Sequence, residues 1–217
     1  PPTTEPSERF EPATFAIAPG TEQVTVTGAE PGNTLTLVDR DGADIATGAV
    51  DEFGALLFRD VEGGSIVRVR DALTQTSEVK VMSRGDTPPP PFYADQRLPT
   101  DGLGYITTRD GTTLSASVWL PGPADDGPYP TVVEYSGYSP SDPDSQGFSD
   151  LLVGLGYAYV GVNIRGTGCS GGSFNYFEYT QSLDGYDAIE TVASQPWVQN
   201  NRVGMVGVSY PGISQLF

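Results

Sequence analysis

Four consecutive prolines at positions 88–91 constrain the fold of this chain more than any other feature of its sequence. Proline has no backbone N–H and a fixed φ, so such a run does not join a sheet and favours an extended polyproline conformation. The run follows Gly85-Asp86-Thr87, and these residues together predict a Pro-rich linker over 85–97. We therefore expect two separately packed parts, one on each side of the linker.

The part before the linker has the pattern of a small all-β domain. Short β-branched runs alternate there with Gly, Pro, Asn and Asp turns, at a spacing of about 8 to 12 residues that is typical of a sandwich. The expected strands lie at 15–17, 24–27, 34–38, 55–58, 66–69 and 79–81. Residues 11–84 are thus predicted to form an immunoglobulin-like β-sandwich, and the polar residues 1–10 a flexible leader.

The part after the linker changes from a hairpin pattern to alternating strands and helices. Residues 105–108 and 114–120 predict an antiparallel hairpin around Asp110-Gly111. Beyond it we expect strands at 131–135, 158–162 and 203–208, and helices at 148–155 and 184–194, the latter with Tyr186, Ile189 and Val192 on its apolar face. This order predicts a mostly parallel sheet with an antiparallel edge hairpin over 98–217.

The last of these strands runs directly into a serine flanked by small residues, Gly207-Val208-Ser209-Tyr210-Pro211-Gly212. A strand that ends in such a serine and resumes as a helix is typical of a nucleophile elbow, in which a strained turn exposes the hydroxyl. We therefore predict Ser209 as a catalytic nucleophile and the backbone N–H of Tyr210 as a donor to the oxyanion. The common elbow has glycine two residues after the serine, where this chain has Pro211, and the alternative is that Ser209 only caps the next helix.

Several linked motifs resemble the X-prolyl dipeptidyl aminopeptidase and cocaine esterase family of α/β-hydrolases. Gly207-Val208-Ser209-Tyr210-Pro211-Gly212 is similar to the family's G-x-S-Y-x-G elbow, and Trp197 with Asn201-Arg202-Val203-Gly204-Met205 to the approach that precedes it. The segment 163–172 is similar to the family's D-x-R-G-x-G-x-S-x-G loop, with Asn163 in place of the usual Asp, and 184–190 to the acidic helix that follows. The resemblance covers about 98–217 and implies the N-terminal part of a serine hydrolase catalytic domain that ends at the elbow.

A second oxyanion donor is expected from the loop after the strand at 131–135. The resemblance implies a tyrosine hydroxyl in this role at the position of Tyr138, whereas Tyr135 is the alternative and is expected in the core. The glycine-rich loop also has a phosphate-binding interpretation, but it lacks a P-loop lysine. Cys169 within this loop is expected to be a small buried or half-buried thiol rather than a nucleophile, because no histidine or other base accompanies it.

The composition limits the partners and the chemistry. A net charge of −17 disfavours nucleic acid as a partner, and no apolar run reaches the ~18 residues of a membrane span. The expected partner is a small ester or peptide substrate, with no cofactor and no metal; the oligomeric state is left open. The polar start without a leader fits a secreted or cell-surface protein or, as the alternative, a cytoplasmic one.

The chain contains no histidine, which is the usual general base for a serine nucleophile. In this fold the acid and the histidine follow the nucleophile in sequence, so Glu178, Asp184 and Asp187 do not fit the acid position and are interpreted as a solvated helix face. We expect a truncated serine hydrolase, acting on esters or on amides such as those after an X-Pro pair, that is inactive by itself. The alternative is a non-catalytic binding or adhesion module or a degenerate hydrolase.

Overall fold

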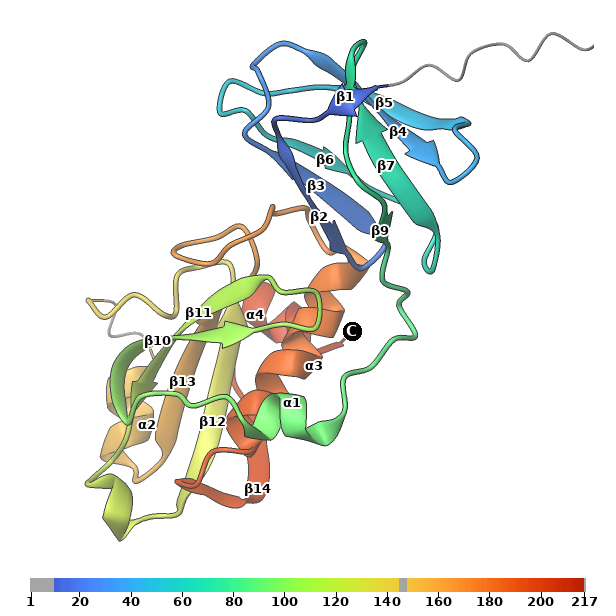
Figure 1. The fold of residues 1–217 in the computed structure, drawn as a ribbon. Helices are drawn as coiled ribbons and strands as arrows, with labels where there is room; N and C mark the ends of the chain where they lie inside the picture. The colour runs from blue at the N-terminus through green and yellow to red at the C-terminus, as the bar shows by residue number, and fades with distance from the viewer. Residues whose placement is uncertain (1–9, 145–147, 217) are drawn as a thin grey trace, which may run out of the picture. The chain divides into compact units, whose positions relative to one another are not determined.

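The computed structural model of the protein describes residues 10–144 and 148–216. Its contacts divide the chain into two units, one up to Asp86 and the other from Thr87 onward (Figure 1). This division falls inside the segment 85–97. Each unit has its own apolar core.

The N-terminal unit consists of two sheets. The larger has the order β1-β8-β7-β4-β5 with β9 on β7, and the smaller has the order β2-β3-β6. The named strands pair antiparallel apart from β1 and β8. Their bounds are β1 Glu11–Pro12, β2 Ala16–Gly20, β3 Gln23–Thr27, β4 Thr34–Asp39, β5 Asp44–Ala49, β6 Leu56–Phe58, β7 Ile66–Arg70, β8 Thr74–Gln75 and β9 Val79–Lys80.

Both sheets contribute to one core, because side chains alternate across each strand. Val24 and Val26 of β3 are fully buried in the same cluster as Leu37 of β4 and Val67 and Val69 of β7. The strand β5 was not expected from the sequence, because its Asp, Ala, Thr and Gly residues carry little β-branched apolar pattern. The immunoglobulin-like class of this unit stays a prediction.

The proline run is not extended throughout, which corrects the expectation for the linker. Pro90 and Pro91 begin the helix α1 (Pro90–Ala94). Proline is well tolerated there, since the first residues of a helix have no intrahelical acceptor for an N–H and proline's φ already suits the helix. The helix buries Tyr93, whose hydroxyl donates to Asp187 at 2.9 Å, so this end of the segment is part of the C-terminal unit.

The C-terminal unit is built on a five-stranded sheet of order β10-β11-β13-β12-β14. β12 pairs in parallel with β13 and β14, whereas β10–β11 and β11–β13 are antiparallel. The sheet is therefore mixed, with equal numbers of the two pair types, rather than mostly parallel. The bounds are β10 Asp101–Thr107, β11 Thr113–Trp119, β12 Tyr129–Ser136, β13 Ala158–Asn163 and β14 Val198–Met205.

Helices cover this sheet, with α3 lying across one of its faces (Figure 1). The helices are α2 Ser149–Gly154, α3 Tyr179–Ala193 and α4 Tyr210–Ile213, with 3-10 turns at Ala124–Asp126 and Ser214–Leu216. The core is centred on β13, which is buried along its whole length, and on Val133 of β12 and Val192 of α3. Among the described residues, no helix has the length and apolar character that crossing a bilayer demands.

The buried face of α3 differs from the predicted one. Tyr186, expected on the apolar face, is 47% exposed, whereas Asp184 and Asp187 are fully buried. The prediction of a solvated acidic face is therefore wrong for these two carboxylates. Their arginine partners, described below, make their burial possible, since a buried charge needs a paired and hydrogen-bonded environment.

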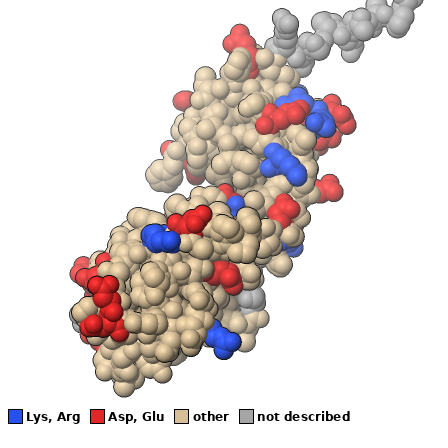
Figure 2. Space-filling model, turned by 60° about the horizontal axis from the view of Figure 1, so that its bottom comes forward, with Lys and Arg blue, Asp and Glu red and all other residues tan. Residues whose placement is uncertain are grey.

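Charged side chains of both signs are interspersed on the surface. On the face drawn in Figure 2, Lys and Arg side chains are scattered, some of them beside acidic side chains, with uncharged surface between them. A continuous basic band, the electrostatic footprint of a nucleic-acid site, is not seen on that face. The exclusion of nucleic acid as a partner stays a prediction from the net charge.

Candidate active site

The strand β14 turns sharply into the short helix α4, and Ser209 lies at this turn. The backbone of Ser209 has φ 64° and ψ −122°, which falls outside the three regions that L-residues readily adopt. Such a conformation costs about 1–3 kcal/mol and persists only where the surrounding structure imposes it. The expected strand to Val208 ends earlier, at Met205, because the chain needs residues 206–209 to make the turn.

Close packing of backbone against backbone requires glycine at the turn. A Cβ atom on Gly207 would lie 2.6 Å from the carbonyl carbon of Pro211, and one on Gly212 would lie 3.1 Å from the Gly207 oxygen. The first distance is shorter than a carbon–carbon contact allows, so position 207 admits no side chain without movement of the turn. Pro211, which departs from the common elbow motif, fits as the second residue of α4, where an N–H is not needed.

The hydroxyl of Ser209 does not cap the helix that follows. A capping serine accepts a hydrogen bond from the N–H of the second or third helical residue. The second is Pro211, which has no N–H, and Ser209 makes no side-chain cap hydrogen bond. Ser209 is also exposed. The strained turn thus presents a solvent-facing hydroxyl that the local structure does not use.

Tyr210 follows the serine, and its side chain is firmly held. Its ring is buried and stacks on Phe177, with centroids 4.9 Å apart and planes at 12°. Its hydroxyl donates to Oε1 of Gln181 at 2.8 Å. Burial raises the pKa of this hydroxyl, while hydrogen bonds with the Phe177 backbone and Gln181 oppose the rise. The backbone N–H of Tyr210 begins α4, where helical carbonyl acceptors are absent.

The two candidate tyrosines after β12 have different surroundings. Tyr135 is buried, its hydroxyl donates to the Gln181 carbonyl at 2.9 Å, and burial raises its pKa well above the ordinary value. Tyr138 is 63% exposed, and its ring lies 6.0 Å from that of Tyr210. Tyr138, unlike Tyr135, is thus exposed and lies beside the ring of Tyr210.

The glycine-rich loop after β13 is fixed by its own hydrogen bonds. Asn163, where the family has Asp, accepts from the backbone N–H and the hydroxyl of Ser141 and donates its amide to Thr167 at 3.3 Å. An aspartate would accept the first two bonds but lacks a donor for the third. Cys169 in this loop is exposed, so the expectation of a buried or half-buried thiol is wrong.

Two arginine–aspartate pairs tie this loop and the hairpin turn to α3. Arg165 of the loop binds Asp184 through two hydrogen bonds of 2.6 and 2.5 Å and contacts Asp110 at 3.1 Å. Arg109 of the hairpin turn binds Asp187 through its backbone N–H at 2.7 Å and its guanidinium at 2.7–3.2 Å. The loop arginine is thus committed to carboxylates, which leaves the phosphate-binding interpretation without a cation in this loop.

Burial and pairing act in opposite directions on these carboxyls. Burial raises the pKa of Asp184 to about 7 against the pull of the Arg165 guanidinium. For Asp110, burial also acts upward, but the Arg165 charge and hydrogen bonds from Thr112 and Thr108 hold its pKa below the ordinary value. Desolvation works against the charged form of Arg165, and its two carboxylate partners still raise its pKa. These groups are part of the fold, and none lies within the turn that carries Ser209.

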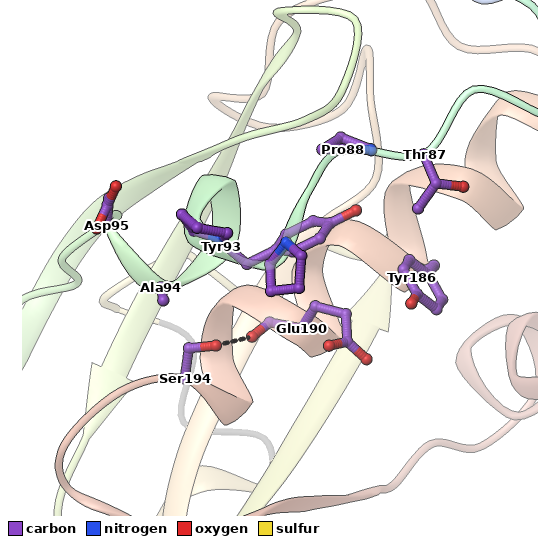
Figure 3. A pocket seen from close by; sticks show the side chains of 10 residues that line it. Thr87, Pro88, Tyr93, Ala94, Asp95, Tyr186, Glu190 and Ser194 are labelled. Carbon is purple, nitrogen blue, oxygen red and sulfur yellow. Dashed lines mark hydrogen bonds between the residues drawn. The ribbon is translucent and has the colours of Figure 1, made fainter.

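A hollow of about 560 Å³ lies elsewhere, between α1 and α3 (Figure 3). It is lined by Tyr93 and Asp95 from the α1 side and by Tyr186, Glu190 and Ser194 from α3. None of its lining residues belongs to the turn at Ser209, to the glycine-rich loop or to the turn after β12. Within the described part of the chain, no group of three or more His, Cys, Asp and Glu side chains could hold a metal ion.

The comparison with protein families finds a match in the half of the chain that contains the turn at Ser209. The model of the X-Pro dipeptidyl-peptidase (S15 family) matches residues 110–217. This half of the chain belongs to the S15 family. The family resemblance predicted from the elbow and the glycine-rich loop is thus confirmed, and the C-terminal half is homologous to a family of hydrolases.

Solved structures with partial similarity include three hydrolases. An α-amino acid ester hydrolase is 24% identical over 52% of this chain and 21% of its own, with a TM-score of 0.45. A CocE/NonD family hydrolase from Staphylococcus aureus is 26% identical over 52% and 23%, with a TM-score of 0.44. An α/β serine hydrolase without a lid from Xanthomonas campestris is 23% identical over 56% of each chain, with a TM-score of 0.43. The chain thus spans about a fifth to a quarter of the length of the first two, and no curated protein matches it.

The sequence did not reveal the hydrogen bond between Gln181 and Tyr210 or the two arginine–aspartate pairs. A signal was present, since Gln181, Asp184 and Ala188 recur at helical spacing and share one face of α3. A helical stripe of polar and small residues usually faces solvent. Only the contacts of this stripe with Arg109, Arg165 and Tyr210 show that it is buried.

Proposed function

We propose that the protein is a serine hydrolase that transfers the acyl group of an ester or a peptide amide to water through an acyl-enzyme on Ser209. The observation that carries this proposal is the backbone of Ser209, which holds an exposed and uncapped hydroxyl at a strained strand-to-helix turn. Membership of residues 110–217 in the S15 family supports the same chemistry.

In the proposed reaction, the Oγ of Ser209 attacks the substrate carbonyl carbon while its proton passes to a general base. The carbonyl oxygen becomes an oxyanion that the Tyr210 backbone N–H and the Tyr138 hydroxyl stabilise. As this intermediate collapses, the base gives the proton to the leaving alcohol or amine, the bond from the carbonyl carbon to that group breaks, and the acyl-enzyme remains. Water then repeats the same sequence and releases the acid.

The proton acceptor is not among the residues described. The chain contains no histidine, so a Ser–His–acid mechanism needs residues that these 217 positions do not supply. We therefore propose that the 217-residue chain alone does not turn over substrate. The Tyr138 assignment rests on its exposure and on its ring contact with Tyr210.

For the substrate, we propose peptides with an X-Pro pair at the N-terminus as the first class to test, since that is the activity for which the matching family is named. Simple esters are the second class, because the same elbow chemistry cleaves both. The natural full-length protein should be assayed with X-Pro anilides and with aryl esters of matched leaving group. The ratio of kcat/KM between the two classes identifies the substrate class.

The nucleophile is tested by Ser209→Ala, which should abolish turnover, and by mass spectrometry of the acylated enzyme, which should place one acyl group on Ser209. Cys169→Ser is the matched control, because Cys169 is an exposed nucleophilic side chain on a neighbouring loop and should be dispensable. Full activity of Ser209→Ala would refute the proposal. Absence of both acylation and turnover in the natural protein would instead favour the non-catalytic alternative.

A further inference from the structure

Gln181 connects the residue after the nucleophile to two other parts of the C-terminal unit. It lies in the first turn of α3 and is 3% exposed. Its Oε1 accepts from the Tyr210 hydroxyl at 2.8 Å, and its Nε2 donates to the carbonyl of Asn175 at 2.6 Å. Its backbone carbonyl accepts from the Tyr135 hydroxyl of β12 at 2.9 Å.

These partners leave the side-chain amide a single orientation. The Asn175 carbonyl is only an acceptor, so the NH₂ group of Gln181 must face it. The amide oxygen must then face Tyr210, and the Tyr210 hydroxyl must donate to it. A flip of the amide would place its oxygen against the Asn175 carbonyl and break that hydrogen bond inside a buried site, where unpaired polar groups are costly. The amide therefore fixes the hydroxyl end of Tyr210 in place.

The other end of Tyr210 carries the proposed oxyanion donor. Its hydroxyl is hydrogen-bonded to Gln181 and its ring is stacked on Phe177, so the side chain cannot change rotamer without the loss of both contacts. The Cα of Tyr210 is bonded both to this fixed side chain and to the backbone nitrogen, so the side chain limits the movement of the N–H. The turn itself is strained at Ser209, and a strained conformation relaxes unless its surroundings hold it.

We propose that Gln181 is a positioning residue, which holds the Tyr210 side chain so that the Tyr210 N–H and the Ser209 hydroxyl keep the geometry of the reaction. The inference rests on the proposed function of Ser209. Gln181 acts through Tyr210 and not on the substrate directly. Asp184 lies one turn further along α3, and its bonds to Arg165 hold the helix that contains Gln181.

The test compares two buried glutamines associated with the same helix. Gln195, just beyond the other end of α3, is 1% exposed, and its amide bonds to Leu98, Gln96 and Thr191. None of these partners belongs to the elbow. In the natural full-length protein, Gln181→Met and Gln195→Met remove the same group from equally buried sites. Both should lower stability, but only Gln181→Met should lower kcat, by about 10²-fold for a displaced catalytic geometry, with little change in KM.

A second variant, Gln181→Glu, should make kcat depend on pH in a way that a side chain with only a packing role would not. A protonated glutamic acid retains one donor and one acceptor and can replace the amide, whereas the ionised form has no donor for the Asn175 carbonyl. Burial raises the pKa of such a carboxyl. The ratio of the variant's kcat to that of the native enzyme should therefore rise as the pH falls, at pH values where both remain folded by circular dichroism.

The outcomes separate this inference from the proposed function. If a fluorophosphonate probe labels Ser209 but Gln181→Met retains the kcat of Gln195→Met, the positioning role is overturned and the nucleophile stands. If the probe does not label Ser209 in the native protein, both are overturned. If Gln181→Met does not fold, Tyr210→Phe removes the same hydrogen bond from the other side and keeps the backbone N–H, and an unchanged kcat in that variant would likewise overturn the positioning role.

Discussion

Replacement of Asp187 by alanine should destabilise the C-terminal unit strongly, because this carboxylate is the shared acceptor of a buried cluster. At least four donors converge on it, the backbone N–H, Nε and Nη2 of Arg109 and the hydroxyl of Tyr93, at 2.7–3.2 Å. The side chains of Arg109 and Asp187 are 4% and 0% exposed. The variant leaves the guanidinium buried without this carboxylate.

The magnitude follows from that burial. Removal of one partner from a buried ion pair costs about 3–5 kcal/mol, mostly because the remaining charge is no longer compensated. Asp187→Asn keeps the shape and one acceptor but turns an NH₂ toward the converging donors, so we expect a smaller but still large loss. Asp150, exposed in the first turn of α2, provides the control, since loss of such a carboxylate costs about 0.3–1 kcal/mol.

Tryptophan fluorescence reports on the correct unit. The chain has two tryptophans, Trp119 and Trp197, and both lie beyond Thr87. Urea titration of the 217-residue chain therefore follows the C-terminal unit alone. With a slope of about 2 kcal/mol per M, the expected loss lowers the midpoint by about 2 M for Asp187→Ala and by less than about 0.5 M for Asp150→Ala.

A midpoint shift for Asp187→Ala that is no larger than the shift for Asp150→Ala would contradict the argument. It would mean that Arg109 reaches solvent or another carboxylate when Asp187 is absent. An Arg109→Met, Asp187→Leu double variant examines the same reasoning from the other side, since an apolar replacement of both partners can be neutral or stabilising. A loss in the double variant as large as in Asp187→Ala would also count against it.

Three further outcomes are expected. Gly207→Ala should lower the rate of Ser209 acylation in the natural full-length protein by about 10²-fold, because its Cβ would displace the turn, and labelling at the native rate would show that the turn tolerates a side chain. Tyr138→Phe should lower turnover by about 10²-fold. Tyr135→Phe should instead lower stability by about 1–3 kcal/mol, because a buried hydrogen bond is lost. Activity assays and urea titrations of both variants check these outcomes. The pKa of Asp110 is lower in the folded than in the unfolded protein. Its contribution to stability is therefore present above the unfolded pKa of about 3.9 and is lost as the pH falls from there through the folded-state pKa. Asp110→Asn should weaken this loss of stability at low pH, as followed by tryptophan fluorescence.

The sequence predicted the elements whose cause is local. The hairpin at 101–119, the strands β12 and β13 and the turn at Ser209 follow from apolar alternation and from the placement of glycines, which act over a few residues. The helix beginning at Pro90 was missed because a proline run favours extended backbone unless tertiary contacts, here the burial of Tyr93, reward a first helical turn.

Errors arose where the cause lies far along the chain. The burial of Asp187 depends on Arg109, 78 positions away, and that of Asp184 on Arg165, 19 positions away. Gln181 supports Tyr210 across 29 positions. A helical stripe of polar residues is expected in solvent unless their partners are known, so no pattern within α3 alone could have placed these side chains inside the protein.

The backbone of Ser209 also bears on how this position can change over evolutionary time. A φ of 64° with ψ −122° suits glycine, which has no Cβ to strain, and Ser209→Gly should therefore raise the stability of the chain by about 1 kcal/mol. A lineage that no longer needed the hydroxyl would gain stability from that single change. Serine at 209 is thus less favourable than glycine for its own backbone angles, and a chain with glycine there would lack the hydroxyl that the proposed reaction needs.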